Sequence, residues 1–176
     1  MDICSSVART RTARGDYAGA VAAADLGDEL GAGSDHRWRA WPARSKVDAL
    51  FWWDKWDAAM ESYERFVEDL RGSDRDGRRA RQSRPGRMLG VVAAIHTLRG
   101  ETEAADRLER RLPVSNPHFD LVYAHAQLGA GEPELALERS TGLPFLRPWA
   151  RAIRAESLAM LGRWDEFDGA LQELAD

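Results

Sequence analysis

The chain has 176 residues, of which 44% are hydrophobic, and a formal net charge of −4. This length and apolar content can bury one core, or one short stack of repeats, without metal ions or disulfides, so we expect a single domain over residues 1–176. The mildly acidic balance gives no global sign of a nucleic-acid-binding protein.

The only cysteine, Cys4, cannot form an internal disulfide, which fits a reducing compartment. The first residues lack the apolar core of a signal peptide, and no stretch is long and apolar enough to span a bilayer. We therefore expect a cytoplasmic protein that does not bind membranes.

Helix is expected nearly everywhere, because alanine, leucine, arginine and glutamate dominate and β-branched residues are scarce. Glycine and proline punctuate the helical pattern and place the expected boundaries. In chain order the expected helices are Ile3–Arg14, Asp16–Leu30, Asp35–Trp53, Asp57–Arg71, Arg87–Arg99, Glu101–Leu112, Pro117–Gly129, Glu134–Ser140, Pro148–Leu161 and Trp164–Ala175.

The densest apolar cluster lies in Asp48–Phe66, DALFWWDKWDAAMESYERF, and it breaks at the polar pair Asp54–Lys55. After the break, large apolar residues recur at spacings of three and four, which predicts two helices packed as a hairpin. Pro42 is expected in the first turn of the preceding helix, where proline is tolerated.

One segment interrupts the helical pattern. The polar stretch 72–86, GSDRDGRRARQSRPG, has no large apolar residue and predicts a mobile loop. Its arginines could bind phosphates or an acidic peptide. Two aspartates dilute the charge and no aromatic residue is present to stack on bases, so a solvated loop is favoured over a nucleic-acid site.

The predicted hairpin turns align with one another as RGDYAGA, WDKWDAA, RGETEAA, AGEPELA and LGRWDEF. Five residues after the turn position, the first four contain an alanine, and seven residues before it a small residue recurs. Small residues at both positions would let two antiparallel helices approach closely. The positions are Ala20, Ala59, Ala105 and Ala136 after the turn, and Ala8, Ala93, Ala124 and Ala155 before it, with Val47 in the second hairpin.

This pattern resembles the tetratricopeptide repeat, a unit of helix, turn and helix that stacks into a solenoid. Gly15-Asp-Tyr17 with Ala20 is close to that family's turn, and Pro117 falls where the family places the proline between repeats. The turn spacings are uneven and Phe167 replaces the small residue in the last unit. The resemblance implies an all-α solenoid of about five stacked helical hairpins. A general all-helical bundle is the alternative.

No pattern of catalytic or metal-binding residues stands out. The four histidines have no ligand spacing with carboxylates or with Cys4, and nucleotide-binding and nucleophile motifs are absent. We therefore expect a protein that is not an enzyme and that needs no cofactor and no metal.

The expected function is a non-enzymatic interaction module that binds a peptide or partner protein on a helical-repeat surface. The alternative is a sensor or regulatory segment of a bacterial signalling or transcription regulator. A homodimer through the tryptophan-rich N-terminal half is also open. Candidate partner-binding residues combine exposed aromatic and arginine side chains with first-helix positions that would face a groove: Trp38, Arg39, Trp41, Arg87, His118, Leu121, His125, Trp149 and Glu156.

The last helix is expected to be covered along its apolar stripe. Trp164, Phe167, Leu171 and Leu174 lie on one side of it, where the preceding helix could bury them, and acidic residues lie elsewhere.

Overall fold

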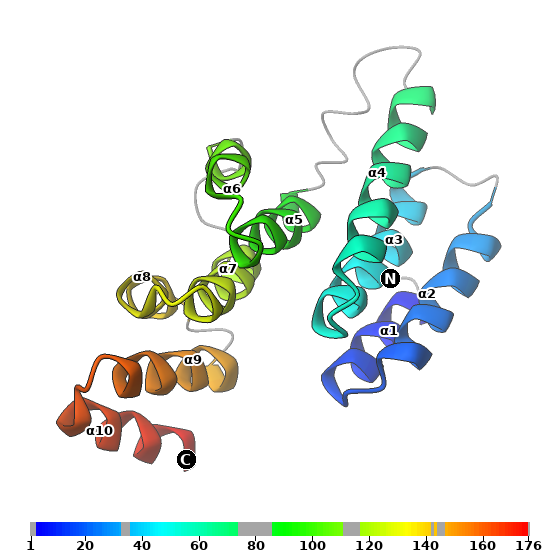
Figure 1. Cartoon of the computed structure of the whole chain (residues 1–176). Coiled ribbons are helices and arrows are strands. Elements are labelled where there is room, and N and C mark those ends of the chain that lie inside the picture. Colours follow the sequence, from blue (N-terminus) through cyan, green and yellow to red (C-terminus); the bar gives the residue numbers. More distant parts are fainter. Residues whose placement is uncertain are drawn as a thin grey trace. The chain divides into compact units, whose positions relative to one another are not determined.

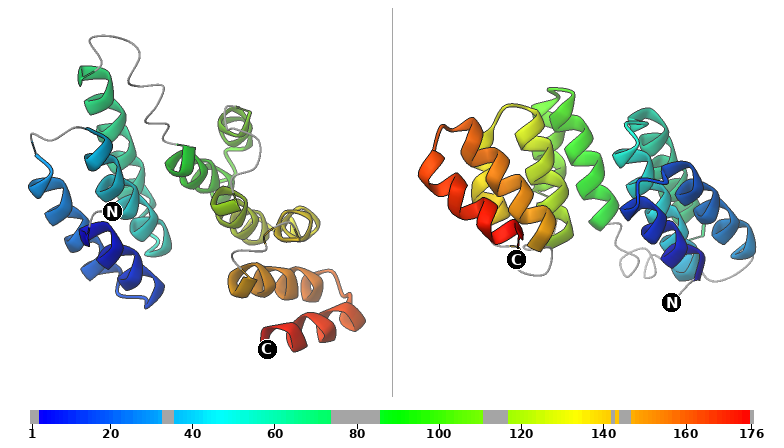
Figure 2. Two further views of the ribbon diagram at one scale, coloured as in Figure 1. Left: turned by 180° about the vertical axis from the view of Figure 1, so that it is seen from behind. Right: turned by 90° about the horizontal axis from the view of Figure 1, so that it is seen from below.

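The computed structural model describes residues 3–32, 36–73, 86–110, 117–141, 143 and 147–175. Within these residues the protein is all-α, with ten helices and no strand (Figures 1 and 2). The helices are α1 (Ile3–Ala13), α2 (Tyr17–Leu30), α3 (His36–Trp52), α4 (Trp56–Ser73), α5 (Gly86–Leu98), α6 (Thr102–Glu109), α7 (Pro117–Gly129), α8 (Pro133–Ser140), α9 (Arg147–Met160) and α10 (Trp164–Ala175).

The helix boundaries agree closely with those expected from the sequence, and α7 begins at Pro117 as predicted. The placement of Pro42 was wrong, because this residue lies inside α3 and not in its first turn. A proline inside a helix removes one backbone hydrogen bond and costs about 3 kcal/mol. Pro42 is fully buried, so apolar burial offsets part of this cost.

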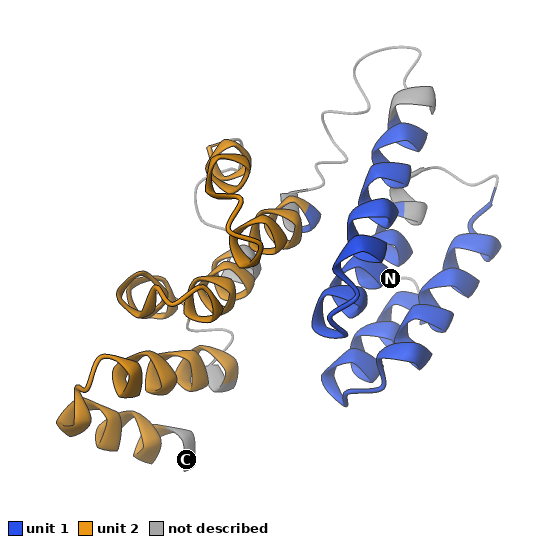
Figure 3. Ribbon diagram, in the orientation of Figure 1, with its two compact units in different colours: residues 1–88 blue, residues 89–176 orange. Residues whose placement is uncertain are grey.

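The chain divides into two compact units, residues 1–88 and residues 89–176 (Figure 3). In unit 1, α1 packs on α2, α2 on α3 and α3 on α4, and α1 also contacts α3. Unit 2 repeats this scheme, since α7 packs on α8, α8 on α9 and α9 on α10, and α7 also contacts α9. The single domain over 1–176 stays a prediction.

Among the described residues, the five tight turns within the helical hairpins share one backbone arrangement. Each has one residue in the left-handed region, namely Gly15, Asp54, Gly100, Gly131 or Gly162, with φ between 56° and 81°. In each turn the next residue's N–H donates to the carbonyl five positions earlier, over 2.9 Å, as in Asp16 to Arg11. This is the Schellman arrangement, which satisfies the last carbonyl groups of a helix.

The small residues predicted at the helix contacts are buried. Ala20, Ala59 and Ala136 have no exposed surface, and Ala8 and Ala24 form a buried cluster with Ala49 of α3. An alanine lets the partner helix approach closely because its side chain occupies little space. The sequence therefore predicted correctly that these small residues are buried.

The expected covering of α10 was wrong in part. Phe167 is half-buried and packs on the cluster of Ala155, Leu158 and Ala170. Trp164 is 60% exposed and Leu171 is 43% exposed, so α9 covers only one edge of the stripe.

The predicted mobile loop falls largely outside the described residues. Its first two residues complete α4, which ends at Ser73, and its last residue begins α5. The stretch 74–85, which carries most of the arginine run, is not described. No described helix is long and apolar enough to cross a membrane.

Candidate functional site

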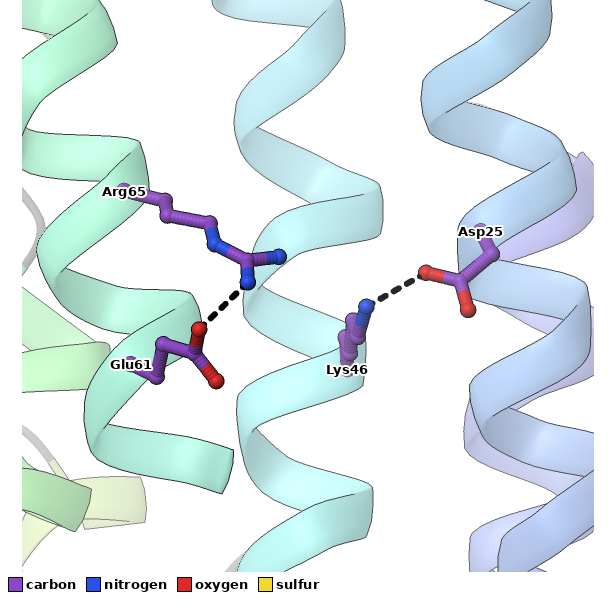
Figure 4. A network of polar contacts seen from close by, with 4 residues as sticks. All are labelled: Asp25, Lys46, Glu61 and Arg65. Atoms are coloured by element: carbon purple, nitrogen blue, oxygen red, sulfur yellow. Dashed lines mark hydrogen bonds and ion pairs between the residues drawn. The ribbon is translucent and has the colours of Figure 1, made fainter. Parts of the chain in front are cut away.

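Unit 1 contains an open groove of about 230 Å³ that is lined by residues of α2, α3 and α4. Figure 4 shows these helices side by side, with α3 between α2 and α4. Each of the three helices contributes both apolar and charged side chains. The lining residues are Ala24, Asp25, Asp28, Pro42, Ala43, Lys46, Ser62, Arg65, Phe66, Glu68 and Asp69.

The base of the groove is apolar because small residues occupy the positions where α2 and α3 approach. Ala24 and Pro42 are buried, and Phe66 of α4 is nearly buried at the opposite wall. A helix surface built from Ala43 and Pro42 has no long side chain to fill the space above it. The hollow therefore follows from the sequence of α3.

Charged residues form the walls, and two ion pairs lie along them (Figure 4). The Nζ of Lys46 donates to Oδ1 of Asp25 across the α2–α3 contact over 2.6 Å. Arg65 pairs with Glu61 one turn earlier on α4. These side chains are partly exposed, so each pair contributes little to stability, about 1 kcal/mol at most.

Acidic residues outnumber basic ones among the described side chains that line this groove. There are two cations, Lys46 and Arg65, and four carboxylates, which belong to Asp25, Asp28, Glu68 and Asp69. The net charge of these six side chains is therefore −2. A groove with low-dielectric walls concentrates such a field. The groove therefore favours a ligand that carries positive charge.

Three predicted partner-binding residues, Trp38, Arg39 and Trp41, belong to the N-terminal half of α3 and precede the groove residue Pro42 in the sequence. Trp41 is exposed, and the guanidinium carbon of Arg44 lies 5.2 Å from the centre of its ring. Trp38 and Arg39 belong to α3, but their side chains lie outside the described residues.

In unit 2, the predicted first-helix positions have different environments. Trp149 and Glu156 of α9 are exposed and His125 of α7 is half-buried. Leu121 does not lie on an open surface, because it is buried in a cluster with Ala150 of α9. Its predicted orientation is thus corrected: it packs toward the next hairpin. The side chains of Arg87 and His118 lie outside the described residues.

A second groove, of about 220 Å³, lies along α9 between α8 and α10. Its position within unit 2 matches that of the first groove within unit 1. Arg151 donates to the backbone carbonyl of Glu173, and the Nη1 of Arg154 lies 3.4 Å from the carboxylate of the same residue. Here cations exceed carboxylates, which is the opposite balance to that of unit 1.

A polar cluster surrounds Arg139 of α8, and it was not predicted from the sequence. Its guanidinium pairs with Glu109 of α6, lies 3.6 Å from the carboxylate of Asp120, and lies 4.4 Å from the centre of the Tyr123 ring. These partners come from two other helices and have no fixed sequence spacing. A hydrogen bond between Tyr123 and Thr97 extends the cluster to α5.

Burial shifts two pKa values in this cluster. The pKa of the Asp120 carboxyl is raised, because burial disfavours the charged form more than the nearby Arg139 favours it. The pKa of Tyr123 is also raised, mainly by burial, against the opposing effect of its bond to Thr97. With Thr97, the cluster therefore joins four helices, α5 to α8, and it lines neither of the two grooves.

Among the described residues, no group of three or more histidine, cysteine, aspartate or glutamate side chains could hold a metal ion. Compared with known proteins, the chain matches no protein-family profile, no curated protein and no solved structure.

Proposed function

We propose that the protein is a non-enzymatic interaction module, and that the groove of unit 1 receives a segment of a partner protein. The single observation that carries this proposal is an open groove with an apolar base and charged walls, built on three helices. Peptide segments bind in such grooves because the apolar base buries side chains while the walls fix their orientation.

We further propose that the hairpins are divergent tetratricopeptide-like repeats. The common Schellman turns, the buried alanines and the contacts between successive first helices support this assignment. Repeat proteins of this kind act through extended surfaces that bind other proteins.

The partner segment is expected to carry arginine or lysine. Among the described residues that line the groove, four carboxylates exceed two cations, and Asp25 binds the ammonium group of Lys46 there. A lysine or arginine of the partner that entered beside Glu68 would pair with its carboxylate, as Lys46 pairs with Asp25.

A displayed library of random peptides provides a direct test, with the full chain as bait. Peptides enriched on the wild type should be basic, and their affinity is then measured by calorimetry. Glu68→Lys, which reverses one charge on the groove wall, should weaken binding by about tenfold or more. Ala43→Trp should block the base of the groove.

Matched controls separate the groove from the rest of the surface. Glu64→Lys makes the same charge change one turn away on α4, and Ala22→Trp adds the same side chain on exposed surface of α2; neither residue lines the groove. Both controls should bind like the wild type. The absence of any enriched peptide, or equal losses in variants and controls, would contradict the proposal.

A further inference from the structure

The hairpins can be compared position by position, because their turns have the same geometry. Gly131 and Gly162, the left-handed residues of the last two turns, are 31 residues apart, so each residue of α7 and α8 has an equivalent 31 positions later in α9 and α10. In unit 1, Gly15 and Asp54 give an offset of 39 between α1 and α3 in the same way.

In the α7–α8 hairpin, one face is covered by the hairpin that follows it. Leu121 and Leu128 of α7 are buried in a cluster with Ala150 of α9. Their equivalents in α9 are Ala152 and Ala159. Ala152 is exposed and Ala159 is half-buried, so no described residue covers this face of the last hairpin in the way that α9 covers α7.

The second helix of the hairpin gives the same result. Ser140 of α8 is buried and lines the second groove together with Arg154 of α9. Its equivalent in α10 is Leu171, which is 43% exposed. The uncovered face of α9 and α10 therefore has small residues on one helix and a large apolar residue on the other. We call it the α9–α10 face, defined by Ala152, Ala159 and Leu171.

A complementary face lies on α1. In α3, Pro42 and Lys46 lie against the preceding helix α2, where Lys46 bonds Asp25. Their equivalents in α1 are Ile3, which is 78% exposed, and Val7, which is 39% exposed. The equivalents of the same two residues in α9 are Ala150 and Arg154, which lie against α8. We call Ile3 and Val7 the α1 face.

The two faces have matching side chains. If α1 took the place that α9 holds on the preceding hairpin, Ile3 would stand where Ala150 stands, opposite Ala152 in place of Leu121. In the interior contact the small Ala150 packs on the large Leu121. In the docked contact the large Ile3 would pack on the small Ala152, so the packed volume would be conserved. Val7 would likewise lie opposite Leu171. In the equivalent interior contact, two polar residues, Arg154 and Ser140, lie together.

The charges of the two helices are also complementary. Within its bounds, α1 carries two arginines and no acidic residue. Within its bounds, α10 carries four acidic residues and no basic one. Of these groups, Arg11 pairs with Asp16, and Glu166 and Glu173 pair with arginines of their own unit. The net charges of the two helices are opposite, and opposite charges steer association.

We propose that the α1 face of one copy of this chain docks on the α9–α10 face of a second copy, head to tail. The contact is heterologous, so each docked copy still presents one open face of each kind unless a ring closes. Assembly should therefore continue beyond a dimer as the protein concentration rises.

Sedimentation velocity of the full chain over a concentration series tests this directly. The wild type should grow from the 19.7 kDa of one chain to species of several chains. Val7→Glu and Leu171→Glu should each weaken association by about a hundredfold or more, because a charge would be desolvated without a partner. Both residues are exposed, so each variant should remain folded, as circular dichroism would verify.

Two matched controls place the same charge elsewhere. Leu26 is 49% exposed on α2 and Leu135 is 46% exposed on α8, and neither belongs to the proposed faces. Leu26→Glu and Leu135→Glu should assemble like the wild type. A loss of assembly in these controls as well would overturn the proposal.

Mixing the two monomeric variants gives the most specific outcome. The Val7→Glu chain keeps an intact α9–α10 face, and the Leu171→Glu chain keeps an intact α1 face. Together they should form a one-to-one dimer and nothing larger, because the remaining pair of faces carries two glutamates. A wild type that stays monomeric at all concentrations, or a mixture that stays monomeric, would overturn head-to-tail docking.

Discussion

At the scale of single residues, the turns depend on backbone conformations that few amino acids adopt. Four turns use glycine in the left-handed region and the second uses Asp54, at φ 56°. An L-residue with a side chain pays about 1–2 kcal/mol for this conformation, because its Cβ crowds the following carbonyl oxygen. Each turn nevertheless makes the same hydrogen bonds, since its backbone geometry is the same.

Exchanging residues at these turns should change stability in opposite directions. Gly100→Ala should destabilise the protein by about 1 kcal/mol, because Gly100 has φ 72° and a Cβ there would meet nothing within 4 Å, so only backbone strain counts. Asp54→Gly should stabilise it by about 0.5–1 kcal/mol. Urea unfolding measures both effects.

Gly169 is the control for the glycine exchange. It lies within α10 with open space around it and no positive φ, so Gly169→Ala should stabilise the helix by about 0.5–1 kcal/mol. If both glycine-to-alanine exchanges shifted stability in the same direction, the left-handed strain would not be the cause.

At the scale of helices, close packing depends on small residues at fixed positions from each turn. Ala59 and Ala105 are buried where the two helices of a hairpin approach. Larger side chains at these positions cannot be accommodated without separating the helices.

Ala59→Leu and Ala105→Leu should each destabilise the fold by about 1–3 kcal/mol through overpacking. Ala22→Leu, on the exposed side of α2, is the control and should change stability by less than about 0.5 kcal/mol. Thermal and urea unfolding give the comparison. Neutral effects at both buried alanines would refute the alignment of the turns.

The Arg139 cluster links α6, α7 and α8, and it predicts a pH dependence. The folded state binds the Asp120 proton more tightly than the unfolded state, because burial raises its pKa above the ordinary value of 3.8. This carboxyl's contribution to stability is therefore lost as pH rises from the unfolded pKa through the raised folded pKa. Above that window the charged, buried carboxylate stays a constant cost.

Asp120→Asn removes this titration. Its stability relative to the wild type should rise with pH through the same window and then level off, as urea unfolding at a series of pH values would measure. A relative stability that falls as pH rises would mean that the ion pair with Arg139 outweighs burial.

At the scale of the whole molecule, the two compact units repeat one scheme of helix contacts, and each has a groove at the equivalent place. The described linings of the two grooves differ in charge, because carboxylates exceed cations in unit 1 and cations exceed carboxylates in unit 2. Head-to-tail docking would use neither groove, because the α1 face and the α9–α10 face lie outside both linings. Binding of a partner and self-association are therefore separable by mutation.

The helices and turns could be predicted from the sequence because local interactions determine them. These local signals are the helical spacing of apolar residues, the glycine that follows a helix, and a proline at a helix start, as at Pro117. Each acts on residues only a few positions away. The buried alanines could be predicted for a related reason, since their distance from each turn fixes which side of the helix they occupy.

The covered and open faces were decided by tertiary structure. Leu121 and Leu171 are both leucines in the middle of a helix, yet one is buried by the next hairpin and the other is exposed. Lys46 and Asp25 meet across a groove, and Arg139 meets Glu109 thirty residues away, because helices distant in the sequence pack side by side. Helical periodicity indicates which side of a helix is apolar, but burial and ion pairing depend on which surface lies opposite, and only the packed structure supplies that surface.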